Sequence, residues 1–365
     1  MGLPATKALA CAAGSPIRVI KVIIQTRLNL MNVVFTICSN NYLAHAATLI
    51  QGWFQYHPDT IGYVILVDEL NTLVDYSIVS PATVVEVDKI GIANLADLVE
   101  KFNITELNTT IKPDAFFYLF EKHRGSKIIY LDPDIMVTGP FDEVFNALEK
   151  DEFVLTPHIC TPVDDDKAPT DYHTLRGGVF NLGFIGLRDT PQIHRFLHWW
   201  RDRVYKYGYC DLPNNMFYDQ LWTNYIPTLF ENYAILKHPG YNMANWNLHE
   251  RKLSQSPDGK WLVNDDYRLK FFHFSGYKFS NPDGIRFYHS RYDFISRPDL
   301  KLLFTEYQQA LSNNGVSFLK TIPCVYFEQH KVIKKQKQLA AERAMPYKAR
   351  MIKKLASVLR KIAHS

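Results

Sequence analysis

Apolar and polar positions along the chain form short blocks that switch between strand-like and helix-like spacing. Runs of β-branched and aromatic residues predict strands at 32–38, 63–67, 83–87, 127–131, 153–156 and 180–187. Between them, apolar residues at helical spacing predict a helix ending at 56 and further helices at 115–122, 141–148 and 191–207. Strands that alternate with helices are typical of a layered α/β domain, which is the fold class we expect.

Beyond residue 207 the pattern becomes rich in loops and aromatic residues. It predicts one further strand at 268–276 and a last helix at 298–311. No internal repeat and no Ser/Gly linker divides the chain, so we expect one continuous domain over residues 31–330. Because Met31 directly precedes a strong strand, we expect residues 1–30 to form an extension outside the fold.

The basic residues are concentrated at the carboxyl end of the chain. The net charge is +4, but residues 331–365 contain eleven Lys or Arg and one acidic residue, which leaves the preceding residues at about −6. We therefore expect no nucleic-acid partner for the body. The segment ARMIKKLASVLRKIA predicts a basic amphipathic helix in this tail. Such a helix either packs on the body or a second subunit, or lies on an anionic membrane.

Cysteine usage and hydropathy indicate the compartment. The five cysteines are scattered and form no C-x-x-C pair, which argues against a disulfide framework or a zinc site. No run approaches the roughly 18 apolar residues that span a bilayer. We expect a cytoplasmic protein, peripheral on the inner face of the plasma membrane if the tail binds there.

The stretch KIIYLDPDIMV places Asp132 and Asp134 at the end of a buried strand. Side chains alternate along a strand, so both carboxylates project to the same side. The carboxyl ends of strands are where α/β sheets bind ligands, and paired carboxylates are suitable ligands for Mg²⁺ or Mn²⁺ that hold a diphosphate. The alternative is that the pair only caps a turn stiffened by Pro133.

Several segments follow one another in a recognisable order: FTICSNNYLAHAATLI, KIIYLDPDIMV, FNLGFIGL, YDQLWTNYI and FHFSGYK. This order resembles glycosyltransferase family 8, a family of retaining enzymes, over roughly residues 31–280. The resemblance implies a GT-A (Rossmann-like) α/β/α sandwich with a central mixed, mostly parallel sheet. It also implies transfer of a sugar from a nucleotide-diphosphate sugar, with UDP favoured, to a hydroxyl of a glycan or lipid-linked glycan.

The resemblance also implies roles for individual residues. Asp132 and Asp134 would bind Mn²⁺ or Mg²⁺ together with His273 of a motif close to HxxGxxK. Asp219 and Gln220 match the pair beside the anomeric carbon and are the catalytic candidates. The residues expected to bind the donor are Thr36, Ile37, Cys38, Tyr42, Asn181, Gly183, Gly276 and Lys278.

Two features depart from the family or lie outside its motifs. Family members commonly carry an Arg in the helix before the Asp-x-Asp strand, whereas this chain offers Lys112 as the nearest substitute. Lys278 also comes one residue early in its motif.

An aromatic loop at 241–251 is the expected acceptor wall, through Tyr241, Asn242, Trp246, Asn247 and His249. Arg176 and the acidic run 164–166 belong to a possible acceptor-side loop, or the acidic run is a solvated turn.

Three other functions use similar features. A phosphohydrolase of the haloacid-dehalogenase type also places Asp-x-Asp after a strand, but its motif opens the fold and has Thr or Val where this chain has Met136. A nucleotidyltransferase should show a Gly-rich phosphate loop near the first strand, which SNNYLAH is not. A non-catalytic sugar-nucleotide-binding protein would keep Asp132 and Asp134 but tolerate loss of Asp219 and Gln220.

Overall fold

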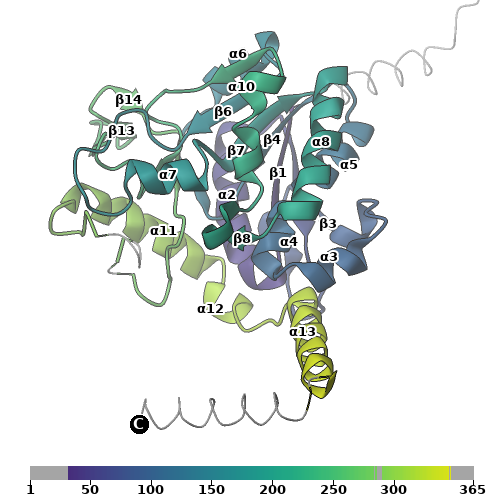
Figure 1. The fold of residues 1–365 in the computed structure, drawn as a ribbon. Helices are drawn as coiled ribbons and strands as arrows, with labels where there is room; N and C mark the ends of the chain where they lie inside the picture. Colours follow the sequence, from purple (N-terminus) through teal and green to yellow (C-terminus); the bar gives the residue numbers. More distant parts are fainter. Residues whose placement is uncertain (1–31, 283, 286–289, 345, 347–365) are drawn as a thin grey trace, which may run out of the picture.

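The computed structural model describes residues 32–282, 284–285, 290–344 and 346, and a seven-stranded sheet lies at its centre (Figure 1). In sheet order the strands are β10 (Tyr233–Ile235), β6 (Phe153–Pro157), β7 (Phe180–Arg188), β4 (Lys127–Leu131), β1 (Val33–Cys38), β2 (Ile61–Leu66) and β3 (Thr83–Glu86). Neighbouring strands are parallel except at β7, which runs antiparallel to both β4 and β6. The structure thus confirms the predicted mixed, mostly parallel sheet.

Helices cover both faces of this sheet. One face carries α3 (Leu95–Lys101), α4 (Ile104–Thr110), α5 (Lys112–Lys122) and α8 (Pro191–Tyr207). The other face carries α2 (Leu43–Tyr56) and α6 (Asp142–Lys150), with α11 (Lys301–Asn313) and α12 (Val316–Leu319) packed against α2. The shorter helices are α7 (Asp171–Gly177), α9 (Gln220–Thr223) and α10 (Ile226–Leu229).

The alternation of side chains along β1 explains the two layers. Phe35 and Ile37 pack into the cluster beneath α5 and α8, whereas Val34 packs against Leu49 and Trp53 of α2. Every residue of β1 is buried, as expected for a central strand covered on both faces. The sheet therefore forms the middle layer of an α/β/α sandwich.

A small second sheet crosses the carboxyl end of β4. It consists of β11 (Met243–Ala244), β15 (Phe271–His273) and β5 (Ile135–Val137). Because β5 starts directly after Asp134, this sheet ties the Asp-x-Asp turn to a segment more than 130 residues later. Two further sheets contain β12 (Leu253–Gln255), β13 (Trp261–Val263) and β14 (Tyr267–Arg268), and the pair β8 (Cys210–Asp211) and β9 (Met216–Phe217).

Most of the predicted elements are present, with shifts at their ends. The expected strand 268–276 is instead two short strands, β14 and β15, that belong to different sheets. Helices α3 and α4 were not predicted, and α7 forms inside what reads as a loop rich in Asp, Pro and Gly. A capping box at Thr170, with His173 at the third helical position, starts α7.

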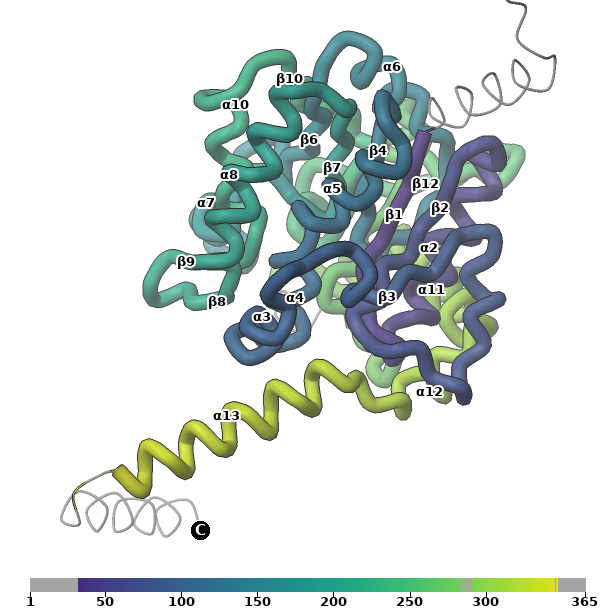
Figure 2. The backbone as a smooth tube through the Cα atoms, turned by 90° about the vertical axis from the view of Figure 1, so that its right-hand side faces the viewer, coloured from purple at the N-terminus to yellow at the C-terminus, as the bar shows by residue number. Residues whose placement is uncertain are grey.

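The carboxyl end of the described chain is the long helix α13 (Val325–Ala344), which packs on α3 and then projects from the body (Figure 2). The helix begins six residues before the expected start of the tail. The predicted amphipathic segment from residue 349 lies outside the described residues, as does the expected extension 1–30. Within the described part of the chain, no helix is long and apolar enough to cross a membrane.

Candidate active site

Three predicted metal ligands converge at the end of β4. The antiparallel pairing of β5 with β15 places His273 opposite Ile135, next to the Asp-x-Asp turn. Nε2 of His273 lies 3.1 Å from Oδ1 of Asp134 and 3.7 Å from Oδ2 of Asp132. One ligand atom from each of the three residues lies within 4.8 Å of the others. Two carboxylates and one imidazole form a donor set suited to a divalent cation such as Mn²⁺ or Mg²⁺.

The neighbours of His273 orient its ring for that role. Its Nδ1 lies 3.1 Å from Oδ1 of Asn181, whose amide nitrogen lies 3.2 Å from Nε2 of His158. An amide oxygen accepts hydrogen bonds, so Nδ1 of His273 is the donor and Nε2 faces the two carboxylates. Burial would lower the pKa of His273, but the charges of Asp134 and Asp132 outweigh burial and raise it. A cation held by the carboxylates would replace that proton on Nε2.

Position 183 requires a glycine because the His273 ring occupies the space that a side chain would fill. A methyl group on Gly183 would lie 2.3 Å from Cε1 and 2.7 Å from Nδ1 of the His273 ring, and 2.9 Å from Oδ1 of Asn181. The Gly183 carbonyl also accepts a hydrogen bond of 2.8 Å from the backbone N–H of Asp132. The absence of a side chain here therefore allows β7 to lie directly against the metal-binding group.

Lys112 links one metal ligand to the catalytic candidate Asp219. Its ammonium lies 2.9 Å from Oδ2 of Asp219 and 3.6 Å from Oδ1 of Asp132, and it donates a 2.9 Å hydrogen bond to the carbonyl of Leu182. Lys112 is 1% exposed and Asp219 is 2% exposed. Burial would lower the pKa of Lys112, but the charges of Asp219 and Asp132 outweigh burial and raise it. The lysine is therefore charged and compensates the buried carboxylate of Asp219 and the half-buried carboxylate of Asp132.

Tyr130 reinforces this arrangement from β4. Its hydroxyl donates a 2.5 Å hydrogen bond to Oδ1 of Asp132. Its ring faces the ammonium of Lys112 at 4.4 Å from the ring centroid, which is a cation–π contact. Asp132 is thus oriented by two groups before any cation binds.

The second catalytic candidate, Gln220, lies two residues after Tyr218, whose backbone is strained. Tyr218 has φ of 53°, a left-handed conformation that is uncommon for a residue with a bulky side chain. The side-chain amide of Gln220 donates a 2.5 Å hydrogen bond to the carbonyl of Gly177, and its oxygen lies 3.4 Å from the backbone N–H of Leu182. The turn therefore holds Asp219 and Gln220 against β7, beside the metal-binding group.

These groups line one cavity of about 790 Å³. Its wall includes Asp132, Asp134, His273, Lys112, Asp219 and Gln220 from the group above. Further lining comes from α7, through His173, Thr174, Arg176 and Gly177, and from Phe217 of β9 and the adjacent Tyr218. A cavity of this size is in the range of small-molecule binding sites and leaves room for a nucleotide-sugar-sized ligand.

The structure brings only some of the expected donor-binding residues into this cavity. Asn181, Gly183, Gly276 and Lys112 line it. The side chains of Thr36, Ile37 and Cys38 are buried in the core, on alternating faces of β1, and do not reach it. Tyr42 lies at the end of β1, stacked on His45 with ring centroids 3.9 Å apart. Lys278 is exposed and does not line the cavity.

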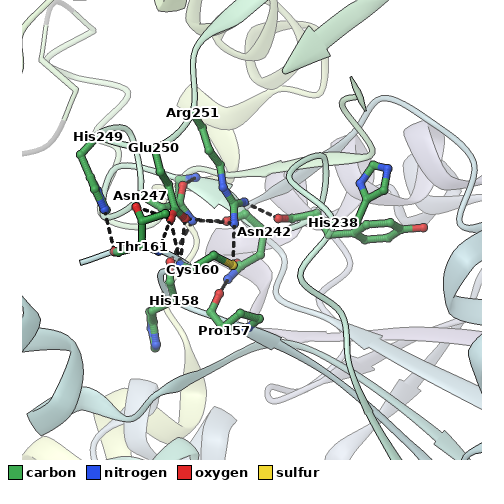
Figure 3. Close-up of polar contacts among 12 residues, drawn as sticks. Pro157, His158, Cys160, Thr161, His238, Asn242, Asn247, His249, Glu250 and Arg251 are labelled. Atoms are coloured by element: carbon green, nitrogen blue, oxygen red, sulfur yellow. Dashed lines mark hydrogen bonds and ion pairs between the residues drawn. The ribbon is translucent and has the colours of Figure 1, made fainter. Parts of the chain in front are cut away.

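Of the expected acceptor residues, Trp246 alone lines the cavity within the described chain. Tyr241 is 1% exposed and donates to Glu143, and the Asn242 and Asn247 side chains donate to the carbonyls of Pro157 and His158. The Asn242 and Asn247 side chains, together with His249 beside the Thr161 carbonyl, fasten the 241–251 loop to residues 157–161 (Figure 3), whereas Tyr241 ties it to α6. Most of their hydrogen-bonding groups are engaged within the fold, Asn242 Oδ1 and His249 Nδ1 are buried without a partner, and none of the four described residues lines the cavity. The ring of Trp246 lies nearly perpendicular to the rings of His158 and His273, at interplanar angles of 70° and 86°. It therefore stacks on neither imidazole.

Several cavity residues are not among the site residues that the sequence predicts. They include Thr105, Thr109, His158, Tyr218, Asn245 and Ser275. His158 is buried, and burial lowers the pKa of its imidazole to about 4, so this ring is neutral at physiological pH. The position of Tyr218 directly before the Asp-Gln pair is the one signal that could have pointed to it.

Comparison with known proteins places the chain near glycosyltransferases of solved structure. No family model matches the sequence. The uncharacterized protein YfnF of Bacillus subtilis is 23% identical over 278 residues, which cover 76% of this chain and 90% of YfnF. Galactosyltransferase LgtC, solved in complex with donor and acceptor sugar analogs, is 14% identical with a TM-score of 0.45, covering 80% of this chain and 98% of LgtC.

Glycosyltransferase GlyE of Streptococcus pneumoniae TIGR4 also matches at 14% identity and a TM-score of 0.45, covering 81% of this chain and 66% of GlyE. Because the TM-scores lie below 0.5, the function has to be argued from the residues of the cavity.

Proposed function

We propose that the chain is a metal-dependent glycosyltransferase that moves a sugar from a nucleotide-diphosphate sugar to a hydroxyl acceptor. The observation that carries this proposal is the convergence of Asp132, Asp134 and His273 within 4.8 Å of one another, beside Asp219 and Gln220 in one cavity. A turn-capping role for the Asp pair does not explain why a histidine from a distant strand faces both carboxylates. A lone binding module would not need the buried Lys112–Asp219 pair next to them.

Each residue of the site has a chemical task in this proposal. Asp132, Asp134 and His273 would hold the divalent cation, which supplies Lewis-acid stabilisation for a leaving nucleoside diphosphate. Lys112 fixes the carboxylates of Asp132 and Asp219 relative to each other. Asp219 and Gln220 present oxygen atoms that stabilise positive charge developing at the anomeric carbon. We include transfer with retention in the proposal, with a polar group on the β-face of the sugar as the stabilising or nucleophilic group.

The finer assignments extend this proposal. We favour Mn²⁺ as the cation, a UDP-sugar as donor, and a glycan or lipid-linked glycan as acceptor in polysaccharide biosynthesis. The catalytic domain would span residues 31–330, with residues 1–30 outside it. Tyr42 at the end of β1, 36% exposed, is the candidate for stacking on the base.

The tail would place the enzyme on the inner face of an anionic membrane. Within α13, Lys331, Lys334, Lys335, Lys337 and Arg343 provide basic groups, and Val332 and Leu339 are about half exposed. Deletion of residues 331–365 should abolish co-sedimentation with liposomes that contain anionic lipid. Unchanged co-sedimentation would rule out this function of the tail.

A nucleotide-sugar screen tests the central proposal. Wild-type protein with Mn²⁺ should gain thermal stability from at least one nucleotide sugar and hydrolyse it slowly, and chelation of the metal should remove both effects. Asp134→Ala should reduce turnover by about 10³-fold, because the cation loses a ligand and several kcal/mol of charge stabilisation. Binding of no nucleotide sugar, or metal-dependent activity retained in Asp134→Ala, would overturn the proposal. Release of inorganic phosphate from simple phosphoesters would favour the phosphohydrolase.

A further inference from the structure

The α7 wall of the cavity carries one cation, Arg176, that the proposed chemistry does not yet use. Its side chain lines the cavity together with His173 and Thr174 of the same helix. Arg176 lies one residue before Gly177, whose carbonyl accepts the 2.5 Å hydrogen bond from the amide of Gln220. Arg176 is therefore attached to the same backbone segment that orients a catalytic candidate.

Local contacts hold the guanidinium of Arg176 in place. Nη2 donates a 2.5 Å hydrogen bond to the carbonyl of Leu212, and the guanidinium carbon lies 5.3 Å from the centre of the Tyr172 ring. Nε of Arg176 is buried, yet it has no hydrogen-bond partner among the described residues. A buried N–H group without an acceptor is unfavourable, so the contacts with the Leu212 carbonyl and the Tyr172 ring leave the guanidinium only partly satisfied.

The charges around the cavity point to the kind of ligand. Asp132, Asp134 and Asp219 contribute three carboxylates, and Lys112 is occupied by two of them and by the Leu182 carbonyl. No carboxylate of the described chain forms an ion pair with Arg176. Arg176 is thus a cation of the cavity wall whose charge is not already balanced by a neighbouring carboxylate.

We propose that Arg176 binds an oxyanion of the substrate, which deepens the proposed transferase function and rests on it. The planar guanidinium can donate two parallel hydrogen bonds to a phosphate or carboxylate group. Two sources can supply this oxyanion: the diphosphate of the donor, or the carboxylate of an acidic sugar such as a uronic acid. The diphosphate source would also account for the lack of an Arg in the helix before β4.

Nucleotide binding to wild type and to an Arg176→Met variant tests this inference. The probes are UDP, UDP-glucose and UDP-glucuronate, or the same series on the base found in the screen, each titrated calorimetrically with Mn²⁺ present. Loss of a charge-assisted contact should weaken binding about 10- to 100-fold. Weaker binding of all three probes identifies the diphosphate as the source. Weaker binding of UDP-glucuronate alone identifies the sugar carboxylate.

Two further variants make the result specific. Arg124→Met removes the same charge from an exposed position outside the cavity and should leave all affinities unchanged. Arg176→Lys keeps the charge but lacks the planar fork, so its loss should fall between wild type and Arg176→Met. Wild-type affinity of Arg176→Met for every probe would overturn the inference while leaving the transferase proposal intact. Wild-type protein that binds none of the probes would overturn both.

Discussion

Two buried polar clusters lie close together in this protein, and they differ in one physical respect. In the cavity cluster, defined as Lys112, Asp132, Asp134, Asp219 and His273, three carboxylates lie close together around one cavity with fewer cations, and Asp132 and Asp134 are only half-buried. In the loop cluster, drawn in Figure 3, the side chains of the 241–251 loop bond to backbone groups and to each other.

Glu250 illustrates how densely the loop cluster is hydrogen-bonded. Its carboxylate accepts hydrogen bonds from the backbone N–H groups of Cys160 and Thr161 and from the Thr161 hydroxyl, and it lies 3.4 Å from Nη2 of Arg251. Arg251 in turn donates to the Tyr241 carbonyl at 2.5 Å. Polar residues bonded to one another and to backbone groups indicate a structural role, although Asn242 Oδ1 and His249 Nδ1 are buried without a partner among the described residues. Converging like charges that need an external cation indicate a binding site.

The largest effect on stability is expected from removing the cation of the cavity cluster. Lys112→Met leaves Asp219 buried without its counter-ion and should lower the free energy of unfolding by about 3–5 kcal/mol. Adding Asp219→Asn should restore most of the stability but not turnover. Urea unfolding of both variants checks this expectation, with Lys112→Arg as the charge-preserving control. A Lys112→Met variant as stable as wild type would show that the buried pair does not stabilise the fold.

Disrupting the loop cluster should lower the free energy of unfolding somewhat less and should leave Mn²⁺ binding unchanged. Glu250→Ala strands three hydrogen-bond donors and should lower the unfolding free energy by about 2–4 kcal/mol. Glu121→Ala, at an exposed position of α5, should change it by less than about 0.5 kcal/mol. Mn²⁺ affinity, measured by titration, should stay the same in both variants. If Glu250→Ala lost Mn²⁺ binding without loss of stability, the division into two clusters would fail.

Gly183→Ala tests whether backbone packing positions the metal ligand. The added methyl group would collide with the His273 ring, so Mn²⁺ affinity should fall about 10- to 100-fold and stability by about 1–3 kcal/mol. Gly186→Ala on the same strand is the matched control, because its methyl group would meet Leu148 at 3.2 Å and Val144 at 3.5 Å, both flexible side chains. Equal Mn²⁺ affinity in the two variants would argue against His273 as a ligand.

The smallest effect is expected at Asp114, a buried carboxylate outside both clusters. Burial raises its pKa to about 6, although the Tyr205 hydroxyl and Arg201 oppose the shift. Because the pKa is higher in the folded state than in the unfolded chain, stability falls as pH rises from about 4 through 6. Asp114→Asn should therefore be about 1–2 kcal/mol more stable than wild type at pH 7.5.

The gain in Asp114→Asn should disappear below about pH 3, where the wild-type carboxyl is largely protonated in both the folded and the unfolded state. Thermal unfolding at the two pH values measures the difference. A gain of equal size at both pH values would mean that packing, and not ionisation, separates the two proteins.

The sequence by itself predicted the strands and helices that carry strong periodicity. It located the strand 127–131 and the Asp pair at its end, because a buried strand is apolar throughout and its end is marked by the change to polar residues. It also indicated the Asn-x-Gly strand and the Asp-Gln pair through a resemblance of ordered motifs. These features are local, because each depends only on a short run of neighbouring residues.

Tertiary structure decided which of the other polar residues belong to the cavity. Tyr241, Asn242 and Asn247 have the residue types of a sugar-binding wall, but strand pairing and burial turn their side chains toward the fold. His158 and Arg176 reach the cavity from segments outside the ordered motifs. The pairing of β5 with β15 brings His273 to Asp134 across more than 130 residues. Such contacts depend on which segments meet in space, which no local pattern records.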